Sequence, residues 1–327
     1  MIPHELFDRP LSLAVWCALH TVDGGGRAVG GEDGHRDFIG YGRRPPTLAW
    51  PGGARLAVNF VVNYEEGAER NALDGDEVHE VLVESRYDVP GGVRDYSTES
   101  GYEYGSRVGI WRVLDAFADR GASPTIFAAA VALERNPAVA DAVRELGYDV
   151  VGHGYRWIAP LGQTREQEAA DVRAALESIR ATTGHQVLGW YTRPPKTENT
   201  RSVLAEAGLL YDCDAFNDDT PYTTEVDGRP FLVVPYSLDV NDIRFWKGQM
   251  FRGEDFADYA CAAFDVLYAE GARASRMLSI GLHPRIIGRP GRIASLWRVI
   301  EHIARHEDVW VTGRDAIARH WLAAVTG

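Results

Sequence analysis

The sequence is poor in cysteine. Its three cysteines, Cys17, Cys213 and Cys261, are odd in number and far apart among 327 residues. No CxxC pair is present, so the chain is not built on a framework of disulfides. A reducing cytoplasm is the simplest compartment for such a chain, and we expect a cytoplasmic localisation.

Long hydrophobic runs and an excess of basic residues are also missing. The early apolar patch at residues 11–19 is short, follows Glu5 and Asp8, and lacks the basic n-region of a signal peptide. No stretch approaches the length that crosses a membrane. The net charge is −13, from 34 basic and 47 acidic residues. Because phosphate binding needs clustered Lys and Arg, we expect neither nucleic acid nor membrane as a partner.

The composition is that of an ordinary folded protein, and its length fits one large α/β barrel or two domains. Residues 1–36 contain glycine runs at 24–26 and 30–31 and show no sustained periodicity. We expect an irregular N-terminal arm there, either partly disordered or packed on a neighbouring subunit. Such an arm favours a homo-oligomer, a dimer or a tetramer.

From residue 37 onwards, strand patterns alternate with helix patterns. Short apolar runs predict strands at residues 56–62, 124–131, 148–152, 187–192, 209–213, 231–235, 277–282 and 309–312. Apolar stripes, capping residues and terminal glycines predict helices over residues 106–121, 136–147, 164–184, 199–207, 254–270, 289–305 and 314–325. This alternation is typical of parallel strands joined by right-handed crossovers. No linker interrupts it, so residues 37–327 are expected to form one barrel.

Residues 70–105 have no clear period but carry several tyrosines among acidic residues and glycines. A long aromatic loop after a strand is commonly a lid or a pocket wall. A surface loop that covers the barrel is the alternative.

Polar residues that can carry chemistry follow the predicted strands, where barrel active sites are built. Glu65 and Glu66 follow the first strand, and further candidates follow later strands: His153, Tyr155, Trp157, Arg193, Lys196, Tyr236, Asp239, His283 and Arg285. Each residue taken alone also fits a role outside catalysis, as part of a solvated acidic loop, as a structural histidine or in a surface ion pair. The convergence of separate loops on one rim is the stronger signal.

Seven sequence blocks carry a family resemblance that runs from about residue 37 to residue 321: NYEEGAE, GHGYRWI, GWYT, NTR, YDCDAFNDD, VVPYSLDVND and SIGLHPRIIGRPGR. In order and spacing they resemble the polysaccharide deacetylase (NodB-homology) superfamily. Within it they are similar to the branch of metal-independent allantoinases and cyclic imide hydrolases. The resemblance implies a distorted (β/α) barrel of about seven parallel strands that hydrolyses a carbon–nitrogen amide bond.

Departures from the deacetylase pattern affect whether this site has enough ligands to bind a metal ion. The family's Asp-Asp pair is replaced by Glu65-Glu66, and the second histidine of its HxxxH pair is Trp157, whose indole N–H only donates. Glu66 and His153 are then the two remaining candidate ligands, whereas a zinc site needs at least three. We therefore expect no metal cofactor, with zinc as the alternative. At Lys196 this sequence departs from the pattern of the allantoinase branch, which indicates that its substrate differs from that of the branch.

The expected reaction is ring opening of a small cyclic amide, imide or ureide. Glu65 or Glu66 would activate water, His153, Arg193 and loop N–H groups would hold the oxyanion, and His283 would protonate the leaving nitrogen. On this reading Glu66→Gln and His283→Ala leave a folded and nearly inactive protein. Residues expected to bind substrate are Tyr64, Tyr155, Trp157, Tyr191, Lys196, Tyr236, Asp239 and Arg285.

Two other functions fit the same rim. A metal-dependent de-N-acetylase would act on an N-acylated sugar or other small molecule, provided a third metal ligand exists. A catalytically inactive barrel would bind a ligand through the same loops.

Overall fold

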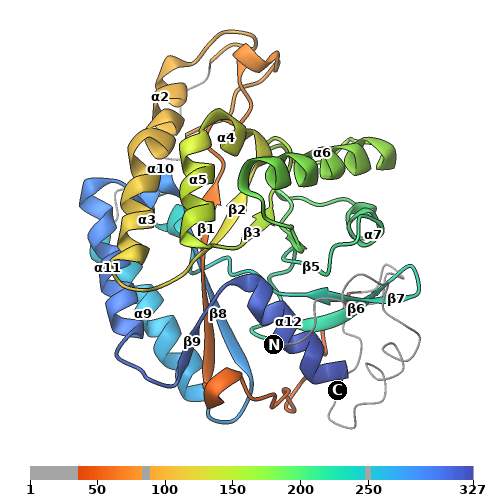
Figure 1. Ribbon diagram of the computed structural model, residues 1–327, viewed down its shortest axis with the longest axis vertical. Coiled ribbons are helices and arrows are strands. Elements are labelled where there is room, and N and C mark those ends of the chain that lie inside the picture. The colour runs from red at the N-terminus through yellow and green to blue at the C-terminus, as the bar shows by residue number, and fades with distance from the viewer. Residues whose placement is uncertain (1–35, 83–88, 247–251, 327) are drawn as a thin grey trace.

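A computed structural model describes residues 36–82, 89–246 and 252–326. Within these residues, nine strands form one curled sheet in the order β6-β7-β5-β4-β3-β2-β1-β8, with β9 paired to β1 (Figure 1). The strands are β1 Leu56–Tyr64, β2 Thr125–Ala128, β3 Val150–Gly152, β4 Gly189–Trp190, β5 Tyr211–Asp212, β6 Tyr222–Val226, β7 Arg229–Val233, β8 Arg276–Leu282 and β9 Val309–Val311. The path from β7 to β8 is parallel throughout. This curled sheet confirms the predicted distorted barrel of about seven parallel strands.

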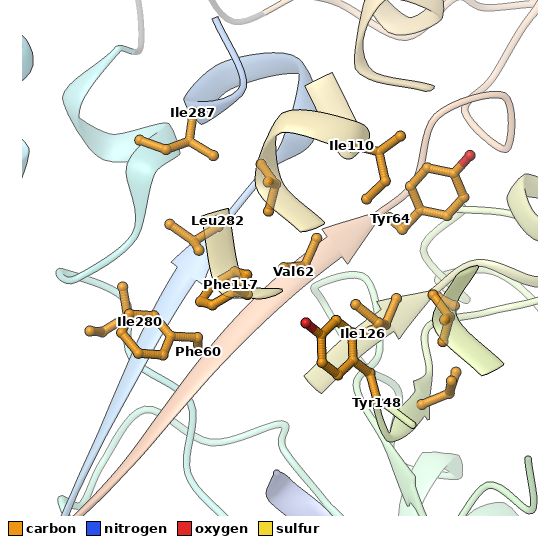
Figure 2. Close-up of a cluster of buried hydrophobic side chains, with 14 of the residues drawn as sticks. Phe60, Val62, Tyr64, Ile110, Phe117, Ile126, Tyr148, Ile280, Leu282 and Ile287 are labelled. Carbon is orange, nitrogen blue, oxygen red and sulfur yellow. The ribbon is translucent and has the colours of Figure 1, made fainter. Parts of the chain in front are cut away.

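Strand β1 is the centre of the sheet, and its side chains alternate between two cores. Phe60, Val62 and Tyr64 belong to the core under the helices, which Figure 2 shows together with Ile110 and Leu282. The alternate residues of β1 face the barrel interior. Of these, Ala57 and Val61 are apolar, and Asn59 and Asn63 make buried hydrogen bonds. This period of two decides which way the residues at the end of β1 point.

Helices cover the outer face of the sheet. The helices are α2 Tyr96–Tyr104, α3 Ile110–Ala118, α4 Ala130–Arg135, α5 Pro137–Leu146, α6 Arg165–Thr183, α7 Thr200–Glu206, α8 Asp242–Phe245, α9 Gly253–Glu270, α10 Pro284–Ile287, α11 Pro290–Ile303 and α12 Arg314–Thr326. Helices α3, α9 and α11 lie on the side of β8, whereas α4, α5 and α6 lie over β2 and β3 (Figure 1). Helix α6 starts with the expected capping box of Thr164 and Gln167. None of the described helices is long and apolar enough to cross a membrane.

Arg314, the first residue of α12, fills the barrel interior below the carboxyl ends of the strands. Its guanidinium is fully buried and donates hydrogen bonds to Asn59 Oδ1 at 3.0 Å and Ser279 Oγ at 2.9 Å. It also donates to the carbonyl of Val234 at 3.0 Å. Helix α12 is thereby anchored inside the barrel, and the functional groups gather at those carboxyl ends.

Five elements differ from the sequence-based expectation, among them the short helices α8 and α10, which lie where no helix was expected. Helix α2 lies inside residues 70–105, where no period was visible, and α4 begins inside the strand predicted at 124–131. Strand β6 was not predicted. It forms an antiparallel hairpin with β7 through Asp227 and Gly228, whose φ angles of 49° and 71° are those of a tight two-residue turn. The predicted arm at residues 1–36 lies almost wholly outside the described residues.

Candidate active site

The ends of β1, β3 and β8 bring one carboxylate and two imidazoles together. Glu65 Oε1 lies 3.3 Å from His153 Nε2 and 3.6 Å from His283 Nε2. All three side chains are buried. The residues were predicted from three separate loops, and the curled parallel sheet places those loops at one rim.

The alternation of β1 separates the two adjacent glutamates. Glu65 continues the series that faces the barrel interior, so its carboxylate meets the histidines. Glu66 falls on the helix side, where its Oε1 accepts the backbone N–H of Arg285 at 3.1 Å and its Oε2 accepts the N–H of Glu65 at 3.1 Å. A Cβ at Gly105 would overlap with the Glu66 carboxylate, so glycine is required there. Glu65 is therefore the carboxylate placed for chemistry, and Glu66 ties the loop together.

His153 is held in one orientation by two partners. Its Nδ1 lies 2.6 Å from the carbonyl of Tyr191, which only accepts, so Nδ1 carries a proton. The indole N–H of Trp157 lies 3.1 Å from His153 Nε2 and donates to it. The ring of Tyr191 stacks on the imidazole with centroids 4.9 Å apart. The lone pair that faces Glu65 is thus already engaged by Trp157.

His283 is paired with a carboxylate on the side away from Glu65. Its Nδ1 lies 2.6 Å from Asp242 Oδ1, and its backbone N–H donates to Asp242 Oδ2 at 2.7 Å. Burial lowers the pKa of His283, but the negative charges of Asp242 and Glu65 outweigh it and raise the pKa to about 9. The imidazole is therefore protonated near neutral pH, with Nε2–H directed at the site.

Glu65 shows the opposite shift. Burial raises the pKa of its carboxyl group, but the positive charges of Arg285 and His283 outweigh burial and hold the pKa well below its ordinary value. Arg285 Nη1 lies 2.8 Å from Glu65 Oε2. A carboxylate and an imidazolium whose pKa values are pushed apart are the usual components of a base and acid pair.

The Asp242–His283 contact predicts a pH effect. As an acid, His283 acts only while protonated, so kcat/KM should fall as pH rises through about 9. Asp242→Asn removes one of the charges that raise the pKa of His283, so this fall should move to lower pH. The raised pKa also stabilises the fold fully below pH 6.5, and that stabilisation is lost as pH rises through about 9.

A pH profile of kcat/KM from pH 5 to pH 10 measures this shift. Asp265→Asn is the matched control, because Asp265 pairs with His302 at 2.7 Å on the surface, away from Glu65. An unchanged profile in Asp242→Asn would mean that His283 is not the acid.

Trp157 is the centre of an aromatic wall. The Arg193 guanidinium lies 3.9 Å from its ring centroid, and the Tyr102 ring lies 6.4 Å away on α2. Arg193 also donates to the Trp157 carbonyl at 2.7 Å and forms an ion pair of 2.6 Å with Glu80. The structure thus places Arg193 behind Trp157, with no contact to Glu65 among the described residues.

Other predicted substrate-binding residues occupy three different places. Tyr64 packs under the helices with its hydroxyl 2.8 Å from Ser106 Oγ, because it belongs to the outward series of β1. The Tyr155 hydroxyl reaches Glu134, outside the barrel. Asp239 is exposed and accepts from Tyr259 at the rim of a cavity of about 750 Å³ between α9 and β8. These three do not reach the catalytic group.

Tyr191 and Tyr236 lie closer to it. The Tyr236 ring is buried 4.9 Å from that of Tyr191, and its hydroxyl accepts from Asn63. Both tyrosines therefore back His153.

Lys196 is half-buried near Asp214. Burial and the charge of Asp212 raise the pKa of Asp214 to about 7, and Lys196 opposes that rise.

Asp242, Glu80 and Tyr102 were not among the predicted site residues. Asp242 had a visible signal, since it belongs to a polar block, Asp239 to Asp242, that follows a predicted strand. Tyr102 belongs to the aromatic segment 70–105, which was expected to be a lid or a pocket wall, whereas Glu80 in the same segment had no signal of its own.

The donor set does not suit a metal ion. No cluster of three or more His, Cys, Asp and Glu side chains that could hold a metal is present in the described part of the chain. Trp157 occupies the Nε2 lone pair of His153, and Arg285 lies against Glu65. Glu66, a candidate ligand only if a metal binds, accepts backbone N–H groups instead.

Known proteins are similar to this chain over most of its length. The family model described as "Polysaccharide deacetylase" matches residues 99–211. A Schizosaccharomyces pombe protein assigned by name to the polysaccharide deacetylases is 39% identical over 311 residues, which cover 88% of this chain and 97% of the relative.

Two crystal structures have the same fold over most of their length. A PuuE allantoinase has a TM-score of 0.84 at 49% identity, covering 88% of this chain and 97% of that chain. A probable polysaccharide deacetylase from Pseudomonas aeruginosa PAO1 has a TM-score of 0.83 at 48% identity, with the same coverage of both chains. The fold, the motif blocks and these relatives lead to one assignment: the chain belongs to the polysaccharide deacetylase family.

Proposed function

We propose that this protein hydrolyses a carbon–nitrogen bond in a small cyclic amide, imide or ureide and thereby opens the ring. The observation that carries the proposal is the buried group of Glu65, His153 and His283. In it a carboxylate of lowered pKa faces an imidazolium whose pKa is about 9. Such a pair supplies a base and an acid within one site.

The chain's own residues account for each proton. Glu65 takes a proton from water as the water oxygen bonds to the ring carbonyl carbon, and the carbonyl electron pair moves onto oxygen. When that pair returns, the C–N bond breaks and His283 Nε2–H protonates the leaving nitrogen. Glu65 then returns its proton to His283, in the direction that their pKa values favour. The products are a carboxylic acid and a freed amide or amine, so one water has been added.

The walls of the site suit a flat ring. Trp157 and Tyr102 pack their rings on the Arg285 guanidinium, and Tyr191 stacks on His153, so flat side chains border the group. The similarity to a PuuE allantoinase at 49% identity supports a cyclic ureide or a related ring, since allantoin is one.

A metal-dependent de-N-acetylase is the second candidate. The family assignment and the S. pombe relative favour it. Metal binding by this second candidate would require Trp157 to move away from His153 and Arg285 to move away from Glu65.

Turnover assays before and after chelation separate these functions. Allantoin, a succinimide-type imide and an N-acetylated amino sugar are the probes, and metal content is measured on the same samples. We expect ring opening that survives chelation. Deacetylation that chelation removes would establish the second candidate, and tight binding of a ring without turnover would indicate an inactive barrel.

A further inference from the structure

We propose that the guanidinium of Arg285 stabilises the oxyanion that forms on the substrate carbonyl, and so supplies the fixed positive charge that a metal ion supplies in other hydrolases. The inference rests on the proposed amide hydrolysis, and it applies equally to a ring amide or an N-acetyl group. Sequence analysis had placed this role on Arg193 and His153.

The contacts of Arg285 engage only part of its guanidinium. Its Nη1 forms an ion pair with Glu65 Oε2 at 2.8 Å and lies 3.6 Å from Glu66 Oε1, whereas its Nε and Nη2 have no hydrogen-bond partner among the described residues. The side chain is 3% exposed, so these N–H groups are shielded from bulk water. A buried cation with uncommitted N–H groups beside the base is placed for charge that develops during the reaction.

The surroundings of the guanidinium restrict where it can act. The rings of Tyr102 and Trp157 lie over it with centroids 4.7 Å and 5.4 Å from its central carbon. The rings cover its faces, so a substrate meets its edge. Its backbone is fixed as well, because the Arg285 N–H donates to Glu66 Oε1. A rigid, buried cation needs no reorganisation as the oxyanion forms.

Arg193 is excluded from this role by its partners. Both of its terminal nitrogens are engaged, one by the Trp157 carbonyl and the other by Glu80 at 2.8 Å. His153 is excluded too, since its Nδ1–H donates to Tyr191 and its Nε2 accepts from Trp157. These contacts hold Arg193 away from Glu65 and leave His153 without an N–H for substrate, so of the three residues it is Arg285 that places a cation beside the base.

A structural ion pair is the competing interpretation of Arg285, and a pH profile separates the two. Removing Arg285 raises the pKa of Glu65 in either case, so the low-pH limb of kcat moves upward. If Arg285 stabilises the oxyanion, Arg285→Ala also lowers the plateau of kcat by about 10²-fold at every pH. If Arg285 only pairs with Glu65, kcat of Arg285→Ala reaches the wild-type plateau at pH values above the shifted limb, and the proposal is overturned.

Chemical rescue strengthens the kinetic test. Guanidinium ion at millimolar concentration should restore about tenfold of the lost kcat in Arg285→Ala, and methylammonium should restore less, because it lacks the planar fork. Arg285→Lys, which keeps the charge, should retain an intermediate kcat if Arg285→Ala does not fold. Arg201→Met is the matched control, since it removes another buried guanidinium from a carboxylate, Asp212, away from Glu65. It should lower thermal stability and leave kcat unchanged.

Zinc binding tests the same inference without any substrate. By calorimetry, the wild type and Trp157→His should not bind zinc stoichiometrically, whereas the double variant Trp157→His/Arg285→Met should bind one ion. Equal zinc affinity in Trp157→His and the double variant would show that the guanidinium does not occupy a cation position, and would overturn the proposal. If only the double variant binds zinc but the wild type opens no ring, the proposed function is wrong and the inference on the position of Arg285 still stands.

Discussion

Glu65→Gln is expected to lower kcat by about 10⁴-fold, the upper end of what a positioned base contributes. Gln keeps the shape of the side chain but cannot take a proton from water. Glu66 stays 3.6 Å from Arg285 and limits the cost of leaving that guanidinium unpaired. Turnover and thermal unfolding of the purified variant measure the two effects separately.

Glu66→Gln is the matched control for this variant. The Glu66 carboxylate accepts two backbone N–H groups, and an amide oxygen satisfies only one of them. We expect a stability loss of about 1–3 kcal/mol and a kcat within about tenfold of wild type. If Glu66→Gln were inactive and Glu65→Gln active, the assignment made from the alternation of β1 would be reversed.

His283→Gln is expected to lower kcat by about 10³-fold, with a dependence on the leaving nitrogen. An acid matters most when the leaving group is basic, so the loss should be greater for an amide or ureide than for an imide. Measuring kcat for both classes of substrate tests whether His283 acts as the acid, and not only whether His283 is needed for activity.

His302→Gln provides the comparison for His283→Gln. His302 pairs with Asp265 on the surface as His283 pairs with Asp242 in the site. Its replacement should leave kcat unchanged for both substrates. An equal loss for imide and ureide in His283→Gln would argue that His283 orders the site and does not act as the acid.

The sequence predicted the barrel well because the strands carry strong apolar runs and the helices carry caps. It could not choose between Glu65 and Glu66, although the alternation of Asn59, Val61 and Asn63 along β1 already contained the answer. Adjacent residues at a strand end face opposite sides, so extending the period by one step assigns Glu65 to the interior. The Asp227-Gly228 pair was likewise a readable hairpin signal that was overlooked.

The partners of the two arginines could not be predicted from sequence. Arg193 and Arg285 both follow strands and both fit an oxyanion role by position. Glu80 engages Arg193 from a segment without periodicity, 113 residues away along the chain. Such long-range contacts decide which arginine reaches Glu65, and no local pattern encodes them.

The hydrogen bond from Trp157 to His153 has a consequence for how such a site can change during evolution. Trp157→His frees the His153 lone pair but leaves Arg285 against Glu65, and Arg285→Met removes the guanidinium but leaves the indole in place. Each single change therefore damages the present site without providing a complete new one. If the site acts as proposed, a change to a metal-binding arrangement must pass through two substitutions that are favourable only together.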